Sequence, residues 1–100
     1  MPTFALIFED DPARPVGDEL RLVHRDYFLG LGDRAMVGGP TFGEDGKVSG
    51  RLMVGDFPSL ADARAWAADE PLVVAGSSRL AKATAMVVAQ KDGVFTPVKR

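Results

Sequence analysis

The chain contains no cysteine and only one histidine, and these two shortages exclude much of the usual chemistry of enzymes. Without cysteine there are no disulfides, thiolate nucleophiles, iron–sulfur clusters or cysteine-based zinc sites. One histidine cannot build a multi-histidine site, so we expect no metal centre. The single imidazole, that of His24, is the main candidate for moving a proton near neutral pH.

A strong charge of one sign is also missing. The chain has 12 Lys and Arg against 14 Asp and Glu, a formal net charge of −2, and its basic residues are scattered along the sequence. Binding to a phosphate backbone requires a basic stripe or cluster. We therefore expect no nucleic-acid partner.

Long hydrophobic runs are absent as well. The apolar segment at residues 3–8 follows no basic region and is too short for a signal peptide or a membrane span. We expect no membrane partner and a cytoplasmic location. What is present is an ordinary globular composition, 46% hydrophobic and 26% charged over 100 residues, which suits one domain over residues 1–100.

The first predicted elements are a strand over residues 3–8 and a helix over residues 18–32. The strand is apolar throughout and is stopped by an acidic run and a proline. Asp18 is the predicted N-cap of the helix. The core-facing stripe of this helix, at spacings of three and four, is Leu20, Val23, Tyr27 and Leu31. His24 lies on the edge of the stripe, so it faces either the interior or a cleft beside it.

The middle of the chain predicts two strands joined by a turn. Residues 35–37 begin the first of them and meet a Gly-Gly-Pro segment at residues 38–40. Permissive glycines followed by the fixed φ of proline favour a bend or bulge there rather than a continued ladder. The glycine-rich turn at residues 43–47 then indicates a hairpin into a strand over residues 52–57.

A second helix follows, with start and stop signals on both sides. Ser59 and Asp62 resemble a capping box, and the helix ends near Asp69. Its apolar positions on one face are Leu60, Ala63, Trp66 and Ala67. Pro71 then opens a short helical turn that Gly76 closes.

The last predicted strand covers residues 83–89, and residues 94–98 form a short edge strand or an arm. The order is therefore strand, helix, strand, strand, helix, strand. This is the α+β, ferredoxin-like arrangement βαββαβ, an antiparallel sheet with both helices on one face.

The first strand is apolar on both of its faces, with Phe4, Leu6 and Phe8 on one and Ala5 and Ile7 on the other. A lone sheet covered on one face would leave a wide apolar patch in water. Such patches usually mark an interface. We therefore predict a homodimer in which two sheets face each other.

Taken together, these segments resemble the YciI-like family of YCII-related domain proteins. The resemblance covers nearly the whole chain, to about residue 90, and depends on the order and spacing of several short motifs. These are residues 3–8, His24-Arg25-Asp26-Tyr27, Leu31-Gly32-Asp33-Arg34, Gly38-Gly39-Pro40, and residues 51–57, 59–67 and 70–76. The resemblance implies a single ferredoxin-like domain that pairs as a dimeric α+β barrel, the architecture of muconolactone isomerases and small cofactor-free monooxygenases.

The resemblance also implies a site. Members of the family carry a histidine on the first helix and an aspartate just before the proline that follows the second helix, proposed as a catalytic dyad. His24 matches the first position. Glu70 stands at the second, with Asp69 one residue earlier, so the carboxylate of Glu70 is displaced by about one methylene.

A carboxylate bound to one imidazole nitrogen fixes the tautomer and leaves the other nitrogen free to exchange a proton. The implied activity is a cofactor-free lyase or isomerase, similar to dehydrochlorinases or muconolactone isomerases, acting on a small organic acid or ring intermediate. His24 would be the general acid or base, and Glu70 or Asp69 its orienter. In the structural alternative, His24 is a half-buried side chain satisfied by a neighbour, and the acidic pair caps the turn at Pro71. The functional alternative is a non-catalytic dimer that binds a small molecule or serves as an accessory or regulatory module.

Arg51, Gly39 and Pro40 are the candidate substrate-binding residues. If Arg51 faces the cleft, its planar guanidinium would hold a substrate carboxylate; if it points outward it is a solvated charge, and we favour the outward orientation. The Gly-Gly-Pro segment either offers backbone N–H groups to a small anion or is only a bend, and we favour the bend. Ser77 and Ser78 have no neighbouring base in sequence and are interpreted as loop polarity.

Overall fold

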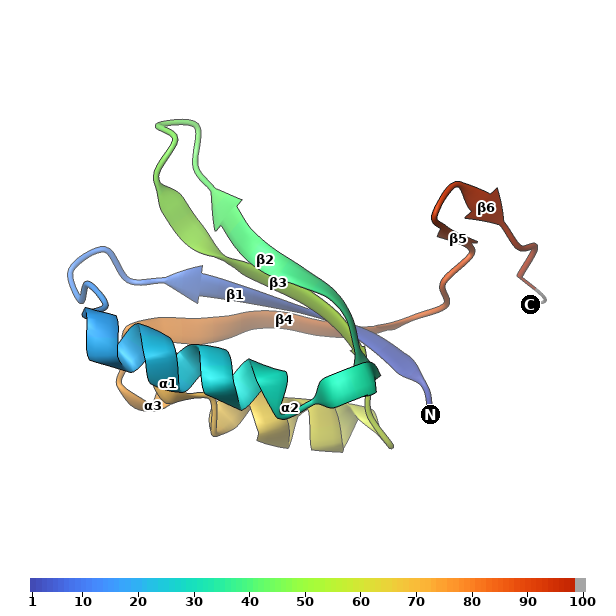
Figure 1. Cartoon of the computed structure of the whole chain (residues 1–100), viewed down its shortest axis with the longest axis horizontal. Coiled ribbons are helices and arrows are strands. Elements are labelled where there is room, and N and C mark those ends of the chain that lie inside the picture. Colours follow the sequence, from blue (N-terminus) through green and yellow to red (C-terminus); the bar gives the residue numbers. More distant parts are fainter. Residues whose placement is uncertain (99–100) are drawn as a thin grey trace.

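Four antiparallel strands in the order β2-β3-β1-β4 form the sheet of the computed structural model, which describes residues 1–98 (Figure 1). The elements are β1 Thr3–Asp10, α1 Asp18–Leu29, the 3-10 turn η1 Gly32–Arg34, β2 Ala35–Phe42, β3 Val48–Asp56, α2 Leu60–Ala68, α3 Pro71–Val74, β4 Ser78–Met86, β5 Gln90–Lys91 and β6 Val94–Phe95. Figure 1 shows the helices together on one side of the sheet. The predicted βαββαβ order and ferredoxin-like fold are confirmed.

The core lies between this face of the sheet and the helices. Alternate residues of β1 point into it, and Phe4, Leu6 and Phe8 are buried there. The other buried members are Leu31, Met53, Phe57, Ala63 and Ala67. Burial of these apolar side chains is the main stabilising contribution to the fold, and it makes β1 a central strand that can hold a site rigidly.

The first helix is rotated relative to the predicted stripe. Val23, which we placed toward the core, is 53% exposed, whereas Phe28 packs against the core. Gly17, in an extended conformation, is the N-cap in place of Asp18, and the helix gives way to η1 earlier than predicted. The rotation places His24 on the inward face of α1 rather than on its edge.

The Gly-Gly-Pro segment at residues 38–40 does not bend out of the sheet, and that prediction was wrong. The segment continues the ladder and pairs with Met53, Leu52 and Arg51 of β3. Register shifts occur near the two ends of β2 instead. β2 is an edge strand, so one of its two sides has no neighbouring strand. Proline is tolerated in edge strands, because an N–H group on the open side has no strand to bond and its loss costs no ladder hydrogen bond.

The last strand of the sheet begins at Ser78, well before the predicted residue 83. Its first half is largely polar, so hydrophobicity alone did not mark it as a strand. Asp10 at the end of β1 pairs with Ser78, after a register shift between Ile7 and Phe8. This pairing brings the end of β1 and the start of β4 together next to α3.

The predicted start and stop signals of the second half are confirmed. The Ser59 side chain accepts a hydrogen bond from the Asp62 N–H at 3.1 Å and caps α2. Pro71 is the first residue of α3, and Gly76 closes the turn with a φ of 78°. A positive φ of this kind favours glycine.

The other face of the sheet has no helix over it within residues 1–98. Its exposed apolar side chains include Ile7, Val37 and Leu52. β5 and β6 form a separate two-stranded hairpin, set apart from the sheet in Figure 1, which confirms the predicted arm. No helix within these residues is long and apolar enough to cross a membrane.

Candidate active site

His24 and Glu70 form a hydrogen-bonded pair between two helices. His24 Nδ1 meets Glu70 Oε1, joining the inward face of α1 to the start of α3. The imidazole is 18% exposed and the carboxylate is fully buried. The Phe28 ring packs at 4.5 Å from the imidazole centroid and so fixes one side of it. The two residues most strongly implied by the resemblance therefore do meet.

Glu70 is also the N-cap of α3. Its Oε1 accepts from the Leu72 N–H and its Oε2 from the Val73 N–H, both at 3.2 Å. The sequence left capping and pairing with His24 as alternatives, and the structure combines them in one side chain. Because the cap holds both oxygens against the backbone, Glu70 presents its carboxylate to His24 in a fixed orientation.

The Glu70 carboxylate is held in its ionised form. Burial by itself raises its pKa, because removing a carboxylate from water disfavours the charge. The hydrogen bond with His24, the Leu72 N–H and the charges of His24 and Arg51 all lower the pKa, and their combined effect brings it below the ordinary value. An ionised carboxylate can only accept hydrogen bonds, so Nδ1 of His24 is the donor.

Asp69 does not take part in this pair. It is exposed at the C-cap of α2, and no hydrogen bond or ion pair joins it to His24 within residues 1–98. Its charge acts instead on Tyr27, whose pKa is raised by burial and then by the charges of Asp69 and Glu70. Of the two candidate carboxylates, Glu70 is the one that reaches the imidazole.

Arg51 lies on the inner face of β3 and is only 9% exposed, so the favoured prediction that it points outward was wrong. Its Nη1 donates to Asp10 Oδ1 at 3.1 Å, and its Nη2 donates to Ser78 Oγ at 2.9 Å. The same Nη2 lies 3.6 Å from Glu70 Oε2. Cζ of Arg51 also lies 5.3 Å from the centroid of the Phe8 ring. Arg51 therefore connects the histidine pair to the ends of β1 and β4.

Ser77 and Ser78 are buried rather than loop-exposed, which corrects their interpretation as loop polarity. The Ser78 hydroxyl accepts from Arg51 and donates to the Glu9 carbonyl at 3.2 Å. Asp10 and Ser78 are the members of this network that the sequence analysis missed. Strand alternation carried a signal for Asp10, because it continues the inward-facing series of Phe8 in β1.

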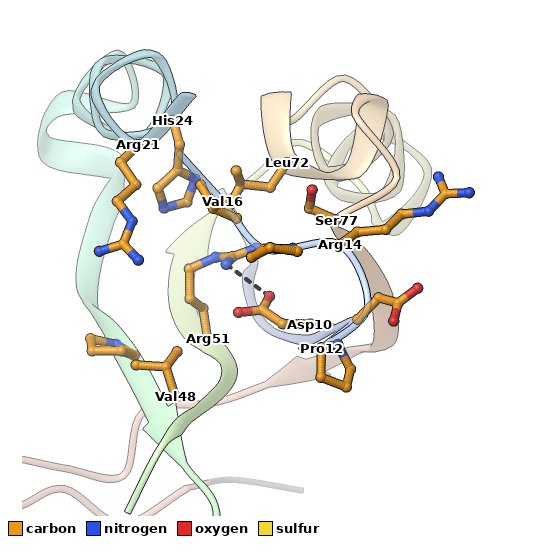
Figure 2. A pocket seen from close by; sticks show the side chains of 13 residues that line it. Asp10, Pro12, Arg14, Val16, Arg21, His24, Val48, Arg51, Leu72 and Ser77 are labelled. Atoms are coloured by element: carbon orange, nitrogen blue, oxygen red, sulfur yellow. Dashed lines mark hydrogen bonds and ion pairs between the residues drawn. The ribbon is translucent and has the colours of Figure 1, made fainter. Parts of the chain in front are cut away.

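Two adjoining cavities open beside this network, and His24 and Arg51 line both of them. The larger, about 420 Å³, lies against Asp10, Arg21, Pro40 and Val48; Figure 2 shows Arg21 and His24 pointing into it from α1. The smaller, about 310 Å³, has Gly39 among its lining residues and is mainly apolar. Gly39 and Pro40 therefore lie at the walls of the two cavities. No group of three or more His, Asp or Glu side chains able to hold a metal ion occurs within residues 1–98.

The comparisons with known proteins support the fold. No protein-family model matches the chain, and no curated protein sequence matches it. Among solved structures it is similar to 5-chloro-2-hydroxyhydroquinone dehydrochlorinase (TftG) from Burkholderia phenoliruptrix AC1100, solved in complex with 2,5-dihydroxybenzoquinone, with a TM-score of 0.61 and 21% identity. The match covers 85% of this chain and 91% of the dehydrochlorinase. The two proteins share the α+β fold.

Proposed function

We propose that the chain is a YciI-like protein whose one YCII-related domain acts as a cofactor-independent lyase or isomerase. In this proposal His24 is the general acid or base and Glu70 its orienter. The observation that carries the proposal is the His24–Glu70 hydrogen bond at the boundary of two cavities. An imidazole with one nitrogen fixed by an ionised carboxylate and its ring beside a ligand-sized space is suited to proton transfer.

The proton transfer follows from the hydrogen bonding. Nδ1–H is donated to Glu70, so in the neutral imidazole the lone pair is on Nε2. Nε2 removes a proton from a carbon or hydroxyl of the substrate, and the released electron pair forms a double bond as a leaving group departs with its own bonding pair. The Glu70 carboxylate stabilises the resulting imidazolium. Return of the proton to another atom of the substrate, without loss of a group, gives isomerisation.

Arg51 serves this proposal as a positioning residue. Its two terminal nitrogens are engaged by Asp10 and Ser78, and it lies next to Glu70, so it holds the orienting carboxylate from the side opposite to His24. This differs from the expected role of gripping a substrate carboxylate. Gly39 and Pro40 remain proposed substrate-binding residues, as parts of the cavity walls.

The similar structure supports the reaction type. TftG is a dehydrochlorinase by name, and its ligand, 2,5-dihydroxybenzoquinone, is an oxygenated six-membered ring. Loss of hydrogen chloride is an elimination of the type that the His24 mechanism describes. Fold likeness alone does not transfer an activity, so the weight of the proposal is on the His24–Glu70 geometry.

We also propose that two copies pair through the open sheet face to form a dimeric α+β barrel. The support is the apolar character of that face, on which Ile7, Val37 and Leu52 are exposed. Burial of side chains of this kind against a second copy would remove a large apolar area from water.

Chloride release from 5-chloro-2-hydroxyhydroquinone tests the proposed activity. We expect the wild-type chain to release chloride and His24→Asn to reduce the rate by about 100-fold or more, because general-base catalysis contributes that much. The matched control is Arg64→Gln, an exposed residue of α2 that lines neither cavity. No release from the wild type, or equal release from His24→Asn, contradicts the elimination. Binding of the compound without turnover would favour the binding-module alternative.

A further inference from the structure

The geometry of the two cavities points to a substrate that is a ring carrying a carboxylate, with the ring in the smaller cavity and the carboxylate on Arg21. We infer that Arg21 is the residue that determines this specificity. The inference rests on the proposed function only in placing the substrate beside His24. Its test measures binding, so it can fail or succeed independently of the proposed catalysis.

Arg21 carries a charge that no acidic side chain neutralises. It precedes His24 by three residues on α1, a spacing that puts both on one face of the helix, and both line the larger cavity. Its side chain is exposed, and within residues 1–98 it has no ion-pair partner. A guanidinium in this position is suited to hold a carboxylate through two parallel hydrogen bonds.

The other two arginines of the larger cavity are less well placed for a ligand. Arg51 is bonded to Asp10 and Ser78. Figure 2 shows the guanidinium of Arg14 turned away from His24, and its Nη1 lies where a side chain at Gly76 would begin. Arg21 is therefore the better placed cation to meet an anionic ligand in this cavity.

The smaller cavity fits a ring. Phe28, Leu29 and Met53 contribute to its apolar lining, and its volume is about 310 Å³. An apolar cavity of about 150 Å³ is enough to accept benzene. Gly38 keeps one wall open, because a Cβ at this position would lie 3.4 Å from Met53 Cγ and any larger side chain would extend into the space.

The imidazole lies where the two parts of such a ligand join. His24 lines both cavities, so a molecule with its ring against Phe28 and its carboxylate on Arg21 passes the imidazole. A neutral ring of the same size would fill the smaller cavity but leave Arg21 without a partner. The charge therefore contributes affinity that ring burial does not.

The experiment is a calorimetric titration of the full chain with benzoate, benzamide and acetate at pH 7.5 and low salt. Benzamide has the ring without the charge, and acetate has the charge without the ring. We expect benzoate to bind about tenfold more tightly than benzamide, because a charge-assisted hydrogen-bonded pair contributes about that much. Benzoate should also bind more tightly than acetate, because its ring buries apolar area in the smaller cavity. Arg21→Gln should lower the affinity for benzoate by about tenfold and leave the affinity for benzamide unchanged. The control Arg64→Gln should change neither of these two affinities.

Gly38→Val tests the ring cavity. It should weaken the binding of benzoate and benzamide, while acetate binds as in the wild type. If valine perturbs folding, the smaller Gly38→Ala is used, with a smaller expected loss because its Cβ would meet Met53 Cγ at 3.4 Å, an ordinary contact distance. No measurable benzoate binding, equal affinity for benzoate and benzamide, or equal losses in Arg21→Gln and Arg64→Gln would each overturn the inference. Retained benzoate preference without chloride release means that only the proposed catalysis fails. Chloride release together with equal affinity for benzoate and benzamide means that only this inference fails.

Discussion

The two faces of the sheet each depart from the usual distribution of side chains in a globular domain, in which charges are exposed and apolar groups are buried. The inner face buries charge, because Arg51 of β3 is buried there next to the buried Glu70 at the start of α3. The outer face exposes apolar side chains, with Val37 at 63% and Leu52 at 40% exposure. Buried charges are costly unless paired, and exposed apolar area is costly unless covered. The difference fits the two proposals, in which the inner side holds the His24–Glu70 pair and the outer face buries its apolar side chains against a second copy.

The largest effect that would break this comparison is loss of the buried arginine. Arg51→Met leaves the fully buried Glu70 and the partly buried Asp10 without this cation, so we expect the free energy of unfolding to fall by about 3–5 kcal/mol. Urea denaturation of the wild type and the variant measures this difference in the free energy of unfolding. The matched control is Arg79→Met, which removes the exposed ion pair between Arg79 of β4 and Glu9 of β1. That change should cost about 0.5 kcal/mol or less. Similar losses in the two variants would mean that burial of the network is unimportant.

The second effect concerns the outer face. Ile7→Lys puts a charge on the exposed face of β1 opposite Lys82, its neighbour in β4. If two copies pair through this face, dimerisation should weaken by about 100-fold or more, because each copy would bury an unpaired charge. Light scattering over a range of concentrations measures the change. A wild-type chain that is monomeric at micromolar concentration contradicts the dimer.

The smallest effect is the pH dependence of stability. The pKa of Glu70 is lowered in the folded chain, so its contribution to stability is fully present above the ordinary glutamate pKa and is lost as the pH falls through the lower, folded value. We expect wild-type stability to fall more steeply than that of Glu70→Gln between neutral and acidic pH. Denaturation curves over that range measure the difference. Parallel pH profiles would show that Glu70 is not held in its ionised form.

The fold could be predicted from the sequence because its signals are local. Apolar runs, the Ser59 cap and the Pro71 to Gly76 turn each act within a few residues, and all three are confirmed. The polar start of β4 was missed because no apolar pattern marks it.

The candidate site could be predicted only in part. His24 stood out as the only histidine, and its pairing with Glu70 came from a resemblance that covers most of the chain. The network around Arg51 joins residues up to 69 positions apart, as in the Ser78–Glu9 hydrogen bond, and depends on the register that pairs Asp10 with Ser78. Local patterns do not specify such a register. Arg21 did carry a local signal, its spacing of three residues from His24, but only the cavities show why that spacing matters.

The central claim is that Glu70 fixes the tautomer of His24, and nitrogen NMR of the imidazole tests it most directly. Because the chain has one histidine, the imidazole signals belong to His24 without ambiguity. We expect the neutral ring to carry its proton on Nδ1 in the wild type and to lose that preference in Glu70→Leu, which removes the acceptor. A wild-type ring protonated on Nε2, or the same tautomer in both proteins, would contradict the account.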